Sequence, residues 1–136
     1  MKKLIPFAAC FIALSLFASC KTLKQVPEDK TSAQIIQMGQ NYAGNSEFKS
    51  AILCYNTVID RFGSNPTVYV EAKYELGRIF LTQRKYEKAY STFTEILEIY
   101  DSYSAMLPGT YKKLCLISLD QIPEKQLSEI KAKKSK

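Results

Sequence analysis

The chain has 136 residues, of which 46% are hydrophobic, and its formal net charge is +6. This length suits a single small domain, and this composition excludes a chain that is disordered through its middle. The sequence contains no histidine, its four cysteines lack the paired spacing of a zinc site, and no glycine-rich loop or nucleophile–base pair appears. We therefore expect neither an enzyme nor a protein that binds a cofactor, a metal or a small-molecule substrate.

The first nineteen residues are typical of a secretory signal peptide: two lysines, the apolar run Leu4–Phe17, and the small residues Ala18 and Ser19. The apolar run is shorter than the ~20 residues that span a bilayer. Cys20 follows directly, and the end of this segment resembles the bacterial lipobox. The resemblance implies cleavage after residue 19 and a covalent lipid on Cys20. The alternative is an ordinary signal peptide followed by an accidental cysteine.

The lipobox resemblance also implies a location in the cell envelope. In lipoproteins of this type an aspartate after the cysteine favours retention in the inner membrane, and this chain has Lys21 there. We therefore expect a lipid-anchored protein at the periplasmic face of the outer membrane rather than the inner membrane. Residues 20–31 contain Pro27 and little apolar periodicity, so they are expected to be a flexible tether between the lipid on Cys20 and the folded part.

A helical domain is predicted over residues 32–122, followed by a short capping helix and basic tail over residues 123–136. Start and stop signals set the expected helix bounds, and Gly63 is expected to end one helix in the left-handed conformation. The expected bounds are Thr31 or Ser32 as N-cap and Gly44 as end of the first helix, Asn45 or Ser46 as N-cap and Phe62 as end of the second, Asn65 as N-cap of a third over Pro66 to Thr82, then Lys85 to Ser102, Tyr111 to Leu119, and Pro123 to about Lys131.

Residues 39–100 carry the same pattern twice, with a period of 38 residues. Apolar residues recur at steps of three and four within each copy, which is the spacing of one helical face. Each copy has small residues where two antiparallel helices would approach most closely, followed by an aromatic residue. These positions are Gly39, Ala51 and Tyr55 in the first copy and Gly77, Ala89 and Phe93 in the second. A fixed period of this length indicates a repeat array.

This pattern resembles the tetratricopeptide repeat (TPR). The resemblance covers residues 32–102 and implies an all-α fold, an α-solenoid of antiparallel helical hairpins with two full repeats. A third unit reaches Cys115 and then loses the pattern, so a degenerate half repeat or cap is expected at the C-terminal end. A coincidental pair of amphipathic hairpins is the alternative.

In TPR proteins the first helix of each repeat lines a concave groove, and the groove positions of the family transfer to eight residues of this chain. They are Ile36, Gln40, Glu71, Tyr74, Arg78, Leu81, Lys112 and Leu116. Arg78 and Lys112 are expected to receive an acidic segment or carboxylate, with apolar contact from the neighbouring tyrosine and leucine. The carboxylate-clamp subgroup needs a basic residue and an asparagine at the first two positions, so that clamp is not expected here. The alternative is a groove that no partner uses.

Three further features have plain readings. Cys54 and Cys115 are expected to be small core residues, although an exported protein is also able to join them in a disulfide bond. The lysine-rich end, Lys131–Lys136, either contacts anionic lipid or polymer or simply keeps that end soluble. Nucleic acid is not an expected partner, because the chain is expected to be exported and no aromatic platform accompanies the lysines.

Together these features predict a membrane-anchored adaptor that presents a helical-repeat groove to another envelope protein. The long repeat resembles those of the TPR lipoprotein of the β-barrel assembly machinery and of the Tol–Pal accessory protein, which implies a role in outer-membrane protein assembly. Two alternatives stay open. One is a pilot lipoprotein that stabilises or localises a single outer-membrane client, and the other is a structural protein whose repeats stack end to end between molecules.

Overall fold

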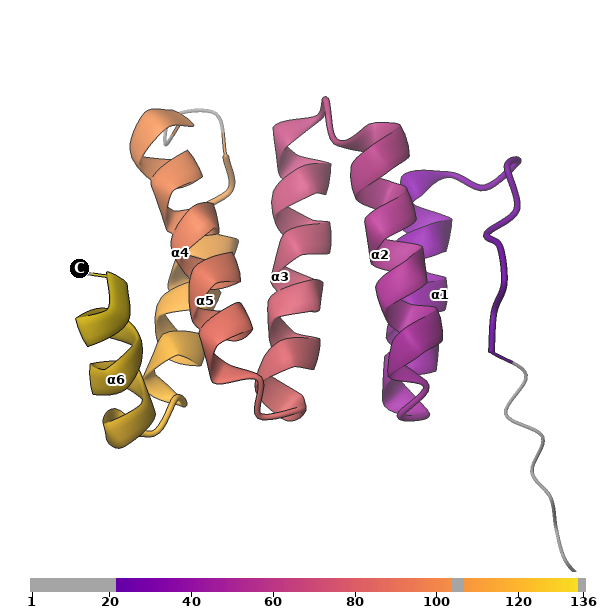
Figure 1. Ribbon diagram of the computed structural model, residues 1–136. Coiled ribbons are helices and arrows are strands. Elements are labelled where there is room, and N and C mark those ends of the chain that lie inside the picture. The colour runs from indigo at the N-terminus through magenta and orange to yellow at the C-terminus, as the bar shows by residue number, and fades with distance from the viewer. Residues whose placement is uncertain (1–21, 104–106, 135–136) are drawn as a thin grey trace, which may run out of the picture.

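The computed structural model describes residues 22–103 and 107–134, and within them the chain is all-α. The six helices of this part pack as adjacent antiparallel pairs that stand side by side in one row (Figure 1). In chain order they are α1 (Ser32–Gly44), α2 (Phe48–Phe62), α3 (Pro66–Thr82), α4 (Tyr86–Tyr103), α5 (Thr110–Asp120) and α6 (Glu124–Lys134). The predicted signal peptide and Cys20 lie outside the described residues.

Two helix starts confirm the predicted capping residues. Thr31 caps α1 through a capping box, in which Thr31 Oγ1 accepts from the N–H of Gln34 at 3.3 Å and Gln34 Oε1 accepts from the N–H of Thr31 at 3.0 Å. Asn65 caps α3 through its Oδ1, and Pro66 occupies the first turn, where a helix has no partner for the N–H that proline lacks. These caps set the start of the first helix in each of the first two pairs.

The turn before α2 and the end of α2 differ from the prediction. Neither Asn45 nor Ser46 caps α2, because Asn45 closes α1 and the N-cap is Glu47, whose side chain makes no capping bond. Gly63 ends α2 in a right-handed conformation (φ −66°, ψ −10°) rather than the left-handed one. Glycine fits there for another reason, since a Cβ would lie 2.3 Å from the carbonyl oxygen of Ile59.

The turn that joins α1 to α2 and the turn that joins α3 to α4 contain the same backbone hydrogen bonds. At the end of α1 the N–H of Ser46 donates to the carbonyl of Ala43 at 3.0 Å, and the N–H of Glu47 donates to that of Tyr42 at 2.8 Å, which is a Schellman motif. Residues 38 positions later make the same two bonds at the end of α3, centred on Arg84. Both central residues have positive φ, 61° and 57°, where glycine is usual. The sequence period is therefore also a period of backbone conformation.

Each of these pairs closes around one glycine and one aromatic ring. Gly39 of α1 lies against Tyr55 of α2, so that a Cβ on it would meet the ring at 2.6 Å. Gly77 of α3 lies in the same way against Phe93 of α4, at 2.5 Å. Both rings are fully buried, as are the two alanines of the pattern. The missing side chain lets the helix axes approach closely, because axis separation depends on the residues at the contact.

The hydrophobic core has two parts that meet at α3. The first joins α1 and α2 to α3, through residues such as Val58 and Ile79. The second joins α3, α4 and α5 around Phe93 and Ile96. Phe80 of α3 packs against both parts. The third helix therefore holds the two closed pairs together.

The segment before α1 is not the flexible tether that the sequence predicts. Val26 is 1% exposed and belongs to the first core. The N–H of Leu23 donates to Ser50 Oγ of α2 at 3.0 Å. The Arg61 guanidinium donates to the carbonyl oxygens of Val26 and Pro27, at 3.1 and 2.8 Å. We call residues 22–31 the strap, and it lies beside α2 (Figure 1). Its apolar residues are too few and too far apart in sequence to indicate burial.

The third pair is not closed like the first two. Within the described residues, α5 packs on α4 and α3, whereas α6 contacts α4 rather than α5. Lys134 lies over the ring of Tyr90, 5.0 Å from its centroid, and Lys133 Nζ lies 3.8 Å from a Glu87 carboxylate oxygen. Because α6 runs to Lys134, past the end expected near residue 131, much of the predicted basic tail is helical.

Gly39→Ala and Gly77→Ala should each lower the free energy of unfolding by about 1–2 kcal/mol, because displacement of a buried ring outweighs the gain in helix propensity. Gly44→Ala is the matched control, since Gly44 is also in α1 and a Cβ there meets nothing within 4 Å. Its stability should be unchanged or higher. Urea unfolding followed by circular dichroism measures all three, and equal stability of the Gly39 and Gly44 variants would contradict the close packing.

Ser46→Gly and Arg84→Gly should each raise the free energy of unfolding by about 0.5–1 kcal/mol, because glycine takes positive φ without a clash of its Cβ. The preceding residues, Asn45 and Gln83, have negative φ of −86° and −79°. Asn45→Gly and Gln83→Gly should therefore lower the stability, because glycine only adds freedom to the unfolded chain there. The same urea assay measures all four variants. If all four change the free energy of unfolding in the same direction, the two turns are not strained.

Candidate functional site

Three helices, α1, α3 and α5, form one face of the row, because α3 contacts both of the others. One cavity opens between α3 and α5, and two more lie between α1 and α3. The cavities are contiguous: Arg78 and Thr82 line the first and the second, and Gln40 lines the second and the third. We call this face the groove. It is built from the helices that the TPR resemblance assigns to the concave side.

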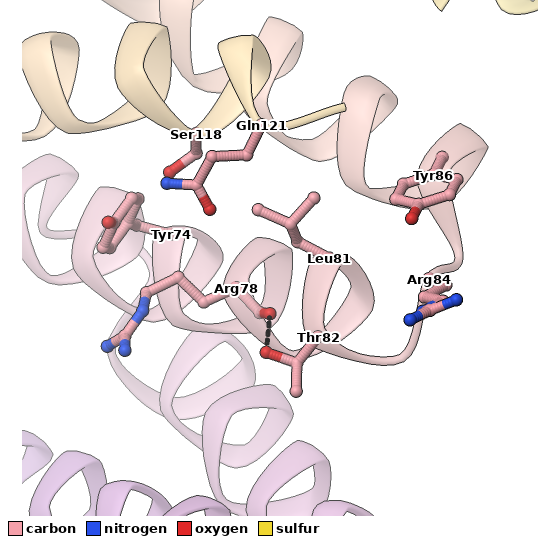
Figure 2. Close-up of a pocket in the computed structure, with 8 residues that line it drawn as sticks. All are labelled: Tyr74, Arg78, Leu81, Thr82, Arg84, Tyr86, Ser118 and Gln121. Carbon is pink, nitrogen blue, oxygen red and sulfur yellow. Dashed lines mark hydrogen bonds between the residues drawn. The ribbon is translucent and has the colours of Figure 1, made fainter. Parts of the chain in front are cut away.

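The cavity between α3 and α5 has a volume of about 410 Å³ and brings together three predicted groove residues, Tyr74, Arg78 and Leu81 (Figure 2). In Figure 2 the Arg78 guanidinium lies below Tyr74, and Leu81 points toward Gln121 of the α5 end. The other lining residues are Thr82, Arg84, Tyr86, Ser118 and Gln121. An apolar side chain and two guanidinium groups thus border one hollow.

Aromatic packing supports one wall of this cavity. The Tyr74 ring is tilted against Phe93 and Tyr111, with centroids 5.9 and 5.5 Å apart, and Tyr74 is only 8% exposed. Burial, and then the nearby Glu71 carboxylate, raise the pKa of Tyr111 well above its ordinary value. Tyr111 therefore stays neutral across the physiological range, and the wall carries no charge of its own.

A buried carboxylate, which was not among the predicted site residues, orders the middle of the groove. Glu75 is 8% exposed, and one of its oxygens accepts from Arg78 Nη1 at 3.1 Å. The other accepts from Gln40 Nε2 of α1, also at 3.1 Å. Glu75 thus offsets part of the Arg78 charge and joins α1 to α3, while the Arg78 side chain stays 57% exposed. The spacing of three residues from Glu75 to Arg78 was a visible signal for this pair.

The groove residues predicted on α1 and at the start of α3 line the smaller cavities. Ile36, Gln40 and Glu71 surround one cavity of about 280 Å³. Ile36 is 5% exposed and belongs to the first core, so it offers a partner little surface. Gln40 and Glu71 are partly exposed, so their side chains are the predicted groove residues that a partner is able to hydrogen-bond in this part of the groove.

The structure does not bring Lys112 and Leu116 into the cavity that holds Arg78. Lys112 is in the first turn of α5, where its Nζ lies 3.7 Å from Asp101 Oδ1. Leu116 is 49% exposed, beside Ile117 at 47%. The second cation that lines this cavity is instead Arg84, which lies on the opposite side of the cavity from the Arg78 guanidinium (Figure 2). Its position depends on the turn after α3, which the helical pattern does not predict.

A second polar cluster lies between α3 and α4. Tyr69 Oη donates to Glu95 Oε1 at 2.6 Å, and Lys73 Nζ donates to Glu95 Oε2 at 2.8 Å. Tyr69 and Glu95 border a cavity of about 510 Å³ that Ile99 and Tyr103 also line. Both oxygens of the Glu95 carboxylate accept a hydrogen bond, one from Tyr69 and one from Lys73. We therefore interpret the cluster as a contact that links α3 to α4, not as a binding site.

Both described cysteines are buried and free, and they belong to different parts of the core. Burial raises the pKa of the Cys54 thiol to about 11 and that of Cys115 to about 12. A thiol must lose its proton to act as a nucleophile, so these two groups are unreactive at neutral pH. They pack as small apolar residues, and the disulfide left open by the sequence does not form.

Residues 22–103 and 107–134 contain neither a cluster of metal ligands nor a helix suited to crossing a bilayer. No three histidine, cysteine, aspartate or glutamate side chains gather there in a way that suits a metal ion. None of the helices there has both the length and the apolar character of a membrane span.

The chain is similar to an uncharacterized protein of Treponema pallidum (strain Nichols), with 34% identity over 110 residues. The similar stretch covers 79% of this chain and 44% of that protein, so the chain spans less than half of its relative's length. No protein-family model matches the sequence. No solved structure matches it either. Because the relative is itself uncharacterized, the similarity brings no function to this chain.

Stability should depend on pH through Glu95. Burial raises the pKa of this carboxyl, but the hydrogen bonds from Lys73 and Tyr69 outweigh burial and hold the pKa below its ordinary value. A carboxyl with a depressed folded pKa stabilises the fold above its unfolded pKa of about 4.3, and the contribution is lost as the pH falls through the folded pKa. Glu95→Gln should therefore lower the free energy of unfolding by about 1 kcal/mol at pH 7, a figure reduced for partial exposure.

The deficit of the Glu95→Gln variant should shrink as the pH falls from the unfolded pKa of the carboxyl toward its depressed folded pKa. Glu98→Gln is the control, because Glu98 is an exposed carboxylate on the same helix. Urea unfolding at pH 7 and pH 3.5 measures the three proteins. A Glu95→Gln deficit that stays constant with pH would show that the charge of Glu95 is not the source of its contribution.

Proposed function

We propose that the protein is a lipid-anchored adaptor of the bacterial cell envelope, which holds a segment of another envelope protein in the groove. The observation that carries this proposal is the cavity of about 410 Å³ between α3 and α5, in which Tyr74 and Leu81 lie beside Arg78. A binding site of this kind combines an apolar anchor position with a few polar groups that set orientation. The lipobox resemblance of the chain around Cys20 supports the anchor.

The groove chemistry favours a segment with one apolar side chain and a carboxylate nearby. Leu81 offers apolar contact, and each of the guanidinium groups of Arg78 and Arg84, on opposite sides of the cavity (Figure 2), is able to make paired hydrogen bonds to a carboxylate. The Glu75 carboxylate already accepts a hydrogen bond from Arg78 and offsets part of its positive charge. The charge of Arg84 is therefore more available to a carboxylate of the partner. The partner we propose is a protein of the outer-membrane assembly machinery or one of its clients, as the TPR resemblance implies.

Photo-crosslinking in bacterial cells tests the groove. A photoreactive residue at Gln121, which lines the cavity, should form a discrete adduct with an envelope protein, and one at Lys113, on α5 outside the cavity, should not. Arg78→Glu should reduce the Gln121 adduct at least about tenfold, since a charged contact to the partner becomes repulsive. Lys112→Glu is the matched control, because it reverses a cation outside this cavity. Adducts of equal yield from Gln121 and Lys113 would overturn the groove as the binding surface.

The anchor is tested separately by mass spectrometry of the protein isolated from membranes. The N-terminal residue should be an acylated Cys20, and Cys20→Ala should release the protein from the membrane fraction, because several acyl chains are needed for stable attachment. An unacylated N-terminus would remove the anchor from the proposal. If many barrel proteins change on deletion of the protein, an assembly role is favoured; if a single client is mislocalised, a pilot role is favoured.

Self-association is a second candidate function, favoured by one specific observation. Leu116 and Ile117 of α5 are adjacent and about half exposed, at 49% and 47%, and α6 does not contact α5 within the described residues. Repeat arrays bury such surfaces against the next repeat. Another molecule would serve that purpose. Sedimentation velocity at several concentrations separates a monomeric adaptor from a stacking protein.

A further inference from the structure

We propose that two copies of this chain pair face to face through α5, in an antiparallel arrangement with two-fold symmetry. The contact is the exposed face of α5, formed by Lys113, Leu116, Ile117 and Asp120, which we call the α5 stripe. The proposal rests on the second candidate function, self-association, and gives it one geometry. It depends neither on the lipid at Cys20 nor on a partner in the groove.

The four residues of the α5 stripe share one side of the helix. An α-helix turns by about 100° per residue, so their directions fall within about 100° of one another. The opposite side of α5 holds Cys115 and Ser118, which are buried. Within residues 22–103 and 107–134, the helices that contact α5 are α3 and α4, and α6 packs on α4 instead. No helix of that part of the chain therefore covers the stripe.

Apolar exposure is concentrated in the middle of the α5 stripe, at Leu116 and Ile117. The other large apolar side chain exposed in the described part of the chain is Tyr103, which lines a cavity beside Tyr69. At the other end of the row the strap is docked on α2, with Val26 buried. A head-to-tail array needs a second, complementary surface, and the described residues offer none of this kind. Association through the stripe therefore closes at two copies.

The two ends of the α5 stripe carry opposite charges. Lys113 and Asp120 are exposed and lie seven residues apart, which is about 10 Å along the helix. Neither makes an ion pair with another described residue. In an antiparallel pair whose two-fold axis passes between Leu116 and Ile117, Lys113 of one copy faces Asp120 of the other. The stripe is thus complementary to itself, whereas a parallel pair would bring like charges together.

The charges next to the stripe do not cancel this complementarity. Lys112 Nζ lies 3.7 Å from Asp101 Oδ1, so these two offset one another at the start of α5. Glu124 and Lys125, which follow the end of α5 in the chain, also have opposite signs. The net charge that a second copy meets is therefore positive at the start of the stripe and negative at its end.

The contact is small, so the pair should be weak in dilute solution. Its apolar centre has two side chains from each copy, and a contact of this size buries less than the ~1,200 Å² of a stable interface. We expect a Kd on the order of 100 µM. The proposed anchor would favour the pair, because two copies confined to one membrane have a higher effective concentration.

Sedimentation velocity of the chain from residue 20 onward tests the pairing, with Cys20→Ala so that no lipid is attached. Between about 10 µM and about 1 mM the protein should pass from monomer to dimer, without larger species. Lys113→Glu and Asp120→Lys should each raise the Kd about tenfold, because two-fold symmetry places each like-charge contact in the interface twice. An equimolar mixture of the two variants should recover most of the lost affinity, since the reversed charges then face each other.

Lys49→Glu and Asp60→Lys are the matched controls, because they reverse exposed charges on α2, far from α5 in the helical row (Figure 1). They should leave the Kd unchanged. All four variants should keep the helical circular dichroism of the unchanged chain, since each altered side chain is exposed. A mixture that associates no better than either α5 variant alone would overturn the α5 pairing. Species larger than a dimer would overturn its two-fold closure.

Two outcomes separate the α5 pairing from the function on which it rests. If the unchanged chain stays monomeric up to about 1 mM, self-association fails and the pairing fails with it. If it forms a dimer that neither α5 variant weakens, self-association stands and the α5 geometry fails. Neither result bears on the groove. A photo-adduct formed from Lys113 through this pairing would join two copies of the chain, so its mass distinguishes it from an adduct with another envelope protein.

Discussion

Close contact between a glycine and an aromatic ring is the constraint on which the rest of this structure depends. In each closed pair, the glycine of the first helix makes room for Tyr55 or Phe93 of the second. The third pair shows what happens without that contact: Cys115 stands in the glycine position, and the aromatic position falls on Lys131. With a side chain on one helix and no ring on the other, α5 and α6 do not close, and α6 packs against α4.

Much of this fold could be predicted from sequence, because its strongest determinants are periodic. The spacing of apolar residues by three and four positions predicted the helices, and the 38-residue repeat predicted which helices pack as pairs. The turns were predicted less well. Ser46 was expected to be an N-cap from its residue type, yet it has positive φ, which its side chain disfavours and which the Schellman hydrogen bonds impose. The strap was missed because Val26 is a single apolar residue in a polar segment, and its burial depends on a surface formed by residues distant in the chain.

The sequence predicted which residues of the candidate site share one face of a single helix, but not which residues of different helices meet there. Tyr74, Arg78 and Leu81 share one face of α3, and spacing alone places them together. Contacts between helices depend on register and on turn geometry, which the pattern does not set. For that reason Lys112 pairs with Asp101 outside the Arg78 cavity, while Gln121, which had no signal of its own, lines it.

Folding and the proposed binding role meet on α3, but they use different sides of it. Val70, Ala72 and Ile79 are buried in the two cores, so they hold the neighbouring pairs in place. Arg78 stays largely exposed, and its bond to Glu75 lies at the edge of the packed region. The side chains that would recognise a partner are therefore mostly not those that stabilise the array. Tyr74 is the exception, since its ring both packs on Phe93 and lines the cavity. A repeat unit arranged in this way is able to change its groove chemistry while the contact of Gly77 with Phe93 keeps the helices in place.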